Sequence, residues 1–515
     1  MFEALRERIF RDITHLSNKA KRTLSINAPS ADALWLAQAA LIARKQNKVL
    51  VLIADNASQC LRLRDDIEYF SPELNVVYFP DWETLPYDLV SPHQDLVSER
   101  LEILYKLSER REKKETLDVI LLTSTTAAQT IAPPQYMAGR VFFFKKGEEI
   151  NAATLRERLV SAGYQHVSQV VAPGEFSVRG SLIDIFPMGA AHPFRLDLFD
   201  TEIDSIRTFD PDTQRSLELV DEVRILPGRE FPVDAQALVN FRAKWREHFT
   251  GDPTKAILYK DLSHGVIDAG IEYYLPLFFD EKASFFDYLN PNETLIGLLG
   301  DNEAALNRFF EETQGRYQFL KADPERPVLP PQSLYMSSEE FFTKLKLFVR
   351  FQAKIDQTEP SKRILVDRKA ENPLQNLERL IDEEKTRKHR VLIMAPSNGR
   401  RETMAQLFDR NGLKVPYVEN FESFCCADAP VMITVGPLYQ GMSVEGITLL
   451  TETELYASTP KRVLKRQSHA SNVDMMIRDL AELKIGDPFT LPTVSGATLV
   501  FKQLKQQMVR KNFYD

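Results

Sequence analysis

The chain has 515 residues, of which 43% are hydrophobic, and its 65 basic and 73 acidic side chains leave a net charge of −8. That length is too great for a single hydrophobic core and predicts about three to five domains. The acidic balance argues against a protein built mainly to coat nucleic acid, although it allows a local basic patch.

The pattern of cysteines and the shortness of the apolar runs indicate the cellular compartment of the protein. Cys60, Cys425 and Cys426 form neither a disulfide framework nor a CxxC metal pair. No apolar run reaches the roughly 18 residues that a membrane span needs. The first 13 residues mix acids into an amphipathic helix and offer no apolar signal core. We expect a cytoplasmic protein that makes no membrane contact.

Residues 1–140 alternate between strand and helix patterns. Apolar runs at 48–53, 75–79 and 117–124 read as buried strands, and helical patterns separate them. This order predicts a doubly wound α/β domain. In such a domain, the first turn between strand and helix is where a nucleotide-binding enzyme keeps its phosphate loop.

The turn at that position lacks most of the groups that hold a phosphate. A working loop needs glycines, a Lys for the terminal phosphates and a Ser or Thr for Mg²⁺. Here Pro29 lacks an N–H donor and Asp32 would repel a triphosphate. The turn consists of Asn27, Ala28, Pro29, Ser30, Ala31, Asp32 and Ala33, without Gly or Lys. We expect a degenerate site that binds no ATP, and no cofactor elsewhere.

Residues 141–226 change to short strands and predict a β-rich domain. Within them, 181–186, 194–199 and 203–209 read as strands, the last two joined by a tight hairpin. Strand alternation then places Arg195, Asp197 and Phe199 on one face. An aromatic side chain therefore lies on the polar face of the strand.

Two interpretations of that face stay open from the residues alone. In one, Phe199 packs under a neighbouring loop and Arg195 pairs with Asp197 or Asp204. In the other, Phe and Arg anchor a partner, as these residue types often do at binding hot spots. Arg179 can join them, although a bulge at the following glycine would change its face.

The hairpin is also rich in acids, which raises the alternative of a Mg²⁺-dependent nuclease. Acids are common at hairpin tips, and Arg195 and Arg207 lie near enough in sequence to pair with them. We therefore expect no catalytic metal. The acids are Asp197, Asp200, Glu202, Asp204, Asp210 and Asp212.

The rest of the chain predicts three further parts. Residues 227–355 hold a helix and several aromatic-rich segments, and the polar stretch 351–363 resembles a linker. A second small α/β domain follows at 363–456, in which residues 382–384 are expected to form a solvated helix face. Residues 457–515 predict a basic linker helix and a tail, more typical of a solvated connector than of a nucleic-acid contact.

Several of these segments carry a family resemblance. FSVRGSLIDIFP, followed by Arg195 and FDTEIDSIRTFDP, resembles the module shared by UvrB and the transcription-repair coupling factor (Mfd). FPDWETLPYDLVSPH and GIEYYLPLFF favour the coupling factor. The resemblance covers roughly residues 20–487 and then stops.

The resemblance implies a fold and a partner. It implies a UvrB-like domain with a decayed ATP site, completed by residues 227–355 after the inserted β-rich domain. It also implies that the inserted domain binds UvrA through Arg179, Arg195 and Phe199, the positions that match the family's contact residues.

The function expected is that of a truncated coupling factor, a non-enzymatic adaptor of nucleotide excision repair. In the family, a barrel that binds RNA polymerase and a DNA translocase motor follow residue 487, so we expect the polymerase contact to be lost. Weak DNA contact stays open. The alternative is an enzyme, either a UvrB-like damage-verifying ATPase or the nuclease described above.

Overall fold

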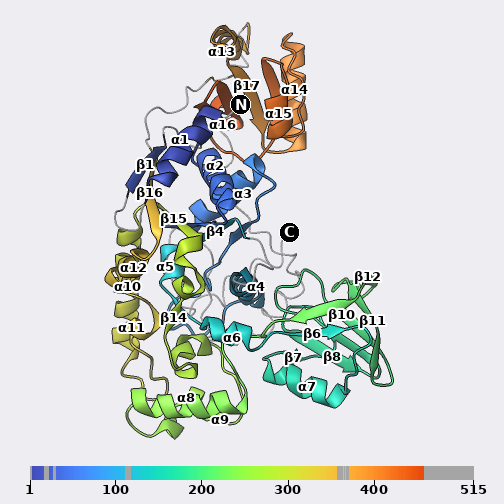
Figure 1. The fold of residues 1–515 in the computed structure, drawn as a ribbon, viewed down its shortest axis with the longest axis vertical. Coiled ribbons are helices and arrows are strands. Elements are labelled where there is room, and N and C mark those ends of the chain that lie inside the picture. The colour runs from blue at the N-terminus through green and yellow to red at the C-terminus, as the bar shows by residue number, and fades with distance from the viewer. Residues whose placement is uncertain are drawn as a thin grey trace, which may run out of the picture. The chain divides into compact units, whose positions relative to one another are not determined.

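A computed structural model describes residues 3–16, 22–26, 31–110, 117–355, 364, 366 and 371–456 (Figure 1). The first four residues of the predicted phosphate turn, at 27–30, lie outside the described residues. So do the predicted basic helix and tail at 457–515.

The first sheet is parallel throughout and joins segments that are far apart in the sequence. Its strand order is β1-β16-β15-β2-β4-β3. The strands are β1 (Arg22–Ile26), β2 (Val49–Ala54), β3 (Val76–Tyr78), β4 (Val119–Thr123), β15 (Thr294–Leu299) and β16 (Val349–Ile355). Strands β15 and β16 therefore complete, from within residues 227–355, a sheet that residues 22–123 begin.

Alternation along β2 builds two hydrophobic cores, one on each face of this sheet. Val49, Val51 and Ile53 belong to one core, and the intervening residues belong to the other. Helices α1 (Glu3–Thr14), α2 (Ala31–Lys45) and α3 (Ala57–Phe70) supply the second core, whereas α4 (Gln94–Arg110) and α12 (Ser338–Leu345) supply the first. A parallel sheet buried on both faces is the doubly wound arrangement, and the predicted α/β fold class is confirmed.

The polar stretch predicted as a linker is partly a strand. Its first five residues, 351–355, belong to β16, which lies between β1 and β15 and pairs with both in parallel. Phe351 and Ala353 are buried in the core, while the polar residue between them lies on the other side of the strand. Because the polar residues of β16 alternate with apolar ones, the overall polarity of the stretch misled the prediction.

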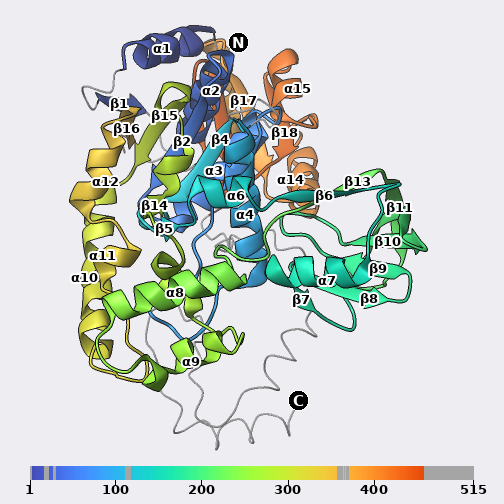
Figure 2. The same ribbon diagram turned by 60° about the horizontal axis from the view of Figure 1, so that its bottom comes forward.

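The second sheet is mostly antiparallel, with the strand order β12-β11-β10-β9-β8-β7. Helix α7 (Ala152–Ser161) covers one face, where Leu155 and Leu159 pack with Phe176, Ile183 and Leu196 (Figure 2). The strands are β7 (Gln165–His166), β8 (Glu175–Arg179), β9 (Leu182–Ile185), β10 (Phe194–Phe199), β11 (Glu202–Phe209) and β12 (Ser216–Val220). We call the opposite face, away from α7, the outer face.

A third sheet, with the order β18-β17-β20-β19, forms the small α/β unit. Glu384, predicted on a solvated helix face, is buried there and accepts hydrogen bonds from Thr448 (3.0 Å) and Arg387 (3.1 Å). The face of this helix that carries Glu384 packs against the third sheet. The run of three acids at 382–384 concealed that buried face in the sequence. The elements are α13 (Gln375–Thr386), β17 (Arg390–Ala395), α14 (Asn398–Arg410), α15 (Phe421–Cys426), β18 (Val431–Val435), β19 (Met442–Val444), β20 (Ile447–Thr451) and α16 (Glu452–Leu455).

The remaining elements connect and surround these sheets. No helix within the described residues is both long enough and apolar enough to cross a membrane. The elements are α5 (Ser124–Ala127), β5 (Thr130–Ile131), α6 (Pro134–Ala138), β6 (Phe142–Lys145), β13 (Glu222–Ile225), α8 (Ala235–His248), η1 (Pro253–Lys255), α9 (Ile257–Ser263), η2 (Ile271–Phe278), β14 (Ala283–Ser284), η3 (Phe285–Tyr288), η4 (Pro291–Glu293), α10 (Asn302–Leu320) and α11 (Pro331–Leu334).

A buried ion pair ties helix α4 to the chain that leaves the second sheet. Arg100 is fully buried, and its guanidinium binds both carboxylate oxygens of Glu230 and the carbonyl of Pro80 (2.8 Å). The same guanidinium lies over the rings of Phe79 and Trp82. Arg100 is thus the cation that balances the buried carboxylate of Glu230, which also accepts a long hydrogen bond from the indole N–H of Trp82 (3.5 Å).

We therefore expect Arg100→Met to lower the free energy of unfolding by about 3–5 kcal/mol, because it leaves the Glu230 carboxylate buried without its cation. Urea denaturation would measure the loss. Arg379→Ala is the control, since Arg379 makes an exposed pair with Glu383 worth at most about 1 kcal/mol. Equal stability of the two variants would contradict the expected role of the buried pair.

Candidate functional site

The outer face of the second sheet carries a row of directly opposed side chains. The register pairs Ser177 with Asp184, Asp184 with Arg195, Arg195 with Arg207, and Arg207 with Leu219. Directly opposed residues of neighbouring antiparallel strands project from the same face. The row therefore crosses five strands, from β8 to β12.

Asp184 organises this row. It is 1% exposed, and its carboxylate accepts hydrogen bonds from Nε (2.7 Å) and Nη2 (3.0 Å) of Arg195. Arg179 pairs with the same carboxylate. The partner expected from the sequence, Asp197 or Asp204, was wrong, because the strand pairing places Asp184 directly opposite Arg195.

The remaining contacts of Arg195 hold its side chain in place. Its guanidinium lies 4.7 Å from the centre of the Phe209 ring and donates to the carbonyl of Gln214 at 3.3 Å. The hydrogen bonds with Asp184 raise the pKa of Arg195 above its ordinary value. Only 18% of the side chain is exposed. Arg195 is thus a fixed cation with a small exposed surface.

Phe199 is the most exposed member of the predicted site. It ends β10, pairs with Glu202 across the hairpin, and is 79% exposed. It does not pack under a loop, as one interpretation had it. The next residue, Asp200, has φ = 59°, the left-handed conformation that a tight hairpin requires. The turn therefore holds a large apolar ring in solvent.

The structure brings Arg179 and Arg195 together on Asp184 and places Phe199 on the same face of β10. Sequence reasoning missed Asp184. The signal available was a single acid inside the apolar strand 181–186, where a buried charge demands a cationic partner.

One of the six acids, Asp210, has a clear structural role directly after β11. Asp210 accepts hydrogen bonds from the backbone N–H (2.6 Å) and hydroxyl (2.8 Å) of Thr213, which lower its pKa. Across the described part of the chain, no group of three or more His, Cys, Asp or Glu side chains could hold a metal ion. The geometry therefore adds no support to the nuclease alternative.

The described part of the predicted phosphate turn is filled by its own ion pair. Asp32, at the start of α2, is buried and accepts a hydrogen bond from the backbone N–H of Ala33 at 2.8 Å. Arg62 of α3 binds both oxygens of Asp32 and also Asp66. A carboxylate and its guanidinium thus lie at the helix terminus where a nucleotide phosphate would bind.

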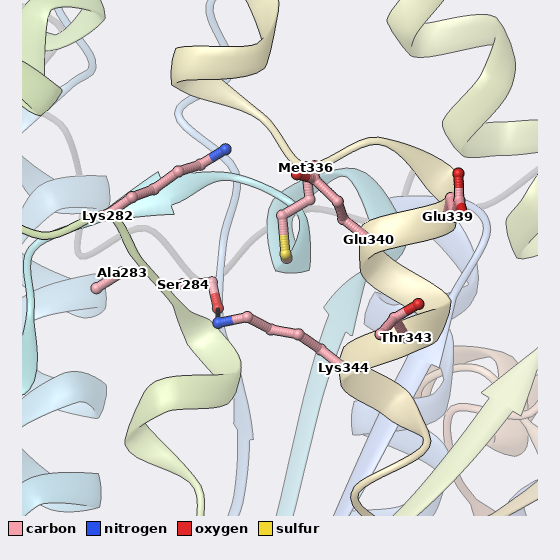
Figure 3. Close-up of a pocket in the computed structure, with 8 residues that line it drawn as sticks. All are labelled: Lys282, Ala283, Ser284, Met336, Glu339, Glu340, Thr343 and Lys344. Atoms are coloured by element: carbon pink, nitrogen blue, oxygen red, sulfur yellow. Dashed lines mark hydrogen bonds between the residues drawn. The ribbon is translucent and has the colours of Figure 1, made fainter.

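A cavity of about 360 Å³ lies between β14 and α12 (Figure 3). Two lysines line it, and both already have partners. Lys344 binds Asp287 and the hydroxyl of Ser284, and Lys282 donates to the carbonyl of Gln332 at 2.6 Å. Burial lowers the pKa of Lys282. Because both ammonium groups already donate hydrogen bonds within the protein, these two lysines do not form an open anion site.

Comparison with known proteins assigns the second and third sheets to families. The model of the UvrB interaction domain matches residues 142–231, and the model named MFD, D3 domain matches residues 384–455. The chain is thus a multidomain α/β protein with a UvrB interaction domain, which contains Arg179, Arg195 and Phe199.

Curated relatives extend the match along the chain. It is 36% identical over 477 residues to the transcription-repair-coupling factor of Haemophilus influenzae and 37% identical over 463 residues to that of Escherichia coli K12. These alignments cover 89% and 87% of this chain but 40% and 39% of the relatives. Over most of its length the chain is similar to about two fifths of a transcription-repair coupling factor, and the predicted resemblance is confirmed.

We expect Asp184→Asn to destabilise the second sheet by about 2–3 kcal/mol, because two guanidiniums lose their shared charge and one of them is largely buried. Hydrogen exchange of the amides in 174–211 would measure the loss. Asp200→Asn is the control, since Asn tolerates the left-handed turn position. Unchanged exchange in Asp184→Asn would show that the carboxylate does not organise the row.

We also expect that the chain neither binds nor hydrolyses ATP. Fluorescent ATP should not bind at millimolar protein, and no turnover should appear with or without DNA, because the Asp32–Arg62 pair occupies the end of α2. Saturable binding of ATP by the wild-type chain would contradict this prediction.

Proposed function

We propose that this chain is an adaptor of nucleotide excision repair that binds UvrA through the outer face of its second sheet. The observation that carries the proposal is the solvent-exposed ring of Phe199 on the same sheet face as two arginines held on one buried carboxylate. The face lies within the segment that matches the UvrB interaction domain. The curated relatives are named for coupling transcription to repair.

The geometry suits protein recognition. A large aromatic ring exposed in the free protein gains by burial in a partner, and Phe and Arg are frequent anchors of interfaces. Because Asp184 already holds Arg179 and Arg195, little side-chain freedom is lost when a partner binds. Arg179, whose side chain is 49% exposed, offers the more accessible guanidinium of the two.

The proposal assigns different roles to the three residues. Phe199 is the apolar anchor, Arg179 supplies an accessible charge, and Arg195 contributes a fixed positive charge with a small exposed surface. The proposed role is non-enzymatic, and it invokes neither a cofactor nor a polymerase contact. The domain boundaries given above stay predictions.

Titration of purified UvrA with this chain tests the proposal. Phe199→Ala should weaken binding ten- to a thousandfold, which corresponds to about 1–4 kcal/mol for the loss of a central aromatic anchor. Phe319→Ala is a matched control, since Phe319 on α10 is another single exposed ring, 86% exposed.

Wild-type affinity in Phe319→Ala, together with a large loss in Phe199→Ala, is the expected outcome. Absence of wild-type binding, or equal losses in the two variants, would refute the proposal that this face binds UvrA.

A further inference from the structure

The outer face continues beyond the three residues of the proposed site, toward the edge strand β12. The row of opposed residues runs from Asp184 through Arg195 to Arg207 on β11 and Leu219 on β12. Arg207 is exposed and Leu219 is 71% exposed. These two residues belong to the same continuous surface as Arg195, one and two strands away.

Arg207 differs from Arg195 in its partners. Arg195 is bound by Asp184, Gln214 and the ring of Phe209, whereas the described residues include no ion pair to Arg207. An exposed guanidinium with its fork of donors unengaged is suited to a bidentate contact with a carboxylate. Of the two opposed arginines, Arg207 is the one with capacity for a new charged contact.

Leu219 lies on an exposed edge. Among the described strands, β12 pairs with β11 alone, and Leu219 pairs with Arg207. A second apolar side chain of the same strand, Leu217, is 52% exposed. An edge strand in a soluble protein usually carries charged or short side chains at such positions. Two exposed leucines there mark a surface suited to being covered by a partner.

We infer that Arg207 and Leu219 form a second half of the UvrA-binding surface, with Arg207 as its main charged contact and Leu219 as an apolar contact at its far edge. The inference rests on the function proposed above. It commits to UvrA as the occupant because the row is continuous with Arg195 and Phe199 on the outer face.

The dimensions suit a single interface. Phe199 lies four positions along β10 from Arg195, about 13 Å at roughly 3.3 Å per residue, and two strand spacings of about 4.8 Å separate Arg195 from Leu219. Such a patch fits within the roughly 800 Å² that each partner buries in an interface of standard size. The recognised surface of UvrA would then present a carboxylate opposite Arg207 and apolar side chains near Phe199 and Leu219.

Titration of UvrA with four variants of the full chain tests the inference. Arg207→Ala and Leu219→Asn should each weaken binding roughly ten- to a hundredfold. Arg207→Lys should recover part of the affinity, because it restores the charge without the planar fork. Phe199→Ala reports on the proposed function in the same experiment.

Controls come from outside the second sheet. Arg308→Ala on α10 and Leu347→Asn, whose native side chain is 60% exposed, change the same residue types at exposed positions. Both should bind as the wild type does. Circular dichroism and thermal unfolding should match the wild type for all variants, since every altered side chain is in solvent.

The outcomes separate the two proposals. If the wild type does not bind UvrA, the proposed function fails. If the wild type binds and Phe199→Ala weakens binding, but Arg207→Ala and Leu219→Asn bind as their controls do, the proposed function stands and the extension to β12 is overturned.

Discussion

The central strand of the first sheet constrains the rest of the structure. Strand β15 pairs with β2 on one side and β16 on the other, although about 240 residues separate β2 from β15. The sheet therefore cannot be completed until the chain has passed through the whole second sheet and returned. Where the chain enters and leaves that second sheet, β6 pairs with β13, and Glu230 binds Arg100 just beyond. The inserted sheet is thus fastened at both of its ends.

The two fastened connections of the inserted sheet favour the binding of a partner protein. A surface carried on a sheet whose two connections are tied presents its side chains in a fixed arrangement, which limits the entropy lost on binding. Inside the sheet, Asp184 also limits the entropy lost on binding, because its buried carboxylate orients two arginines from two strands. The outer face is preorganised by the backbone and then by this carboxylate, while Phe199 and Arg207 remain exposed to a partner.

Local patterns predicted part of the candidate site. Alternation along 194–199 identified Phe199 as an aromatic ring on a polar face, and its exposure agrees with that prediction. The same pattern could not identify the partner of Arg195, because a charged side chain pairs with whichever strand lies opposite and the neighbours in sequence were Asp197 and Asp204. Arg207 was expected to pair with the acids of the hairpin, and Leu219 was not singled out, because only the register of β10, β11 and β12 places both residues beside Arg195.

The sequence by itself determined the features that depend on neighbouring residues: the alternation of strands and helices, the turn without glycine or lysine at 27–33, and the tight hairpin that follows Phe199. Only the tertiary structure decided which strands are neighbours and which polar groups are buried. It placed 351–355 inside the first sheet and buried Glu384 against Thr448. The physical reason is that backbone conformation and periodicity are set over a few residues. Strand order and the pairing of buried charges depend on contacts between residues that are tens to hundreds of positions apart.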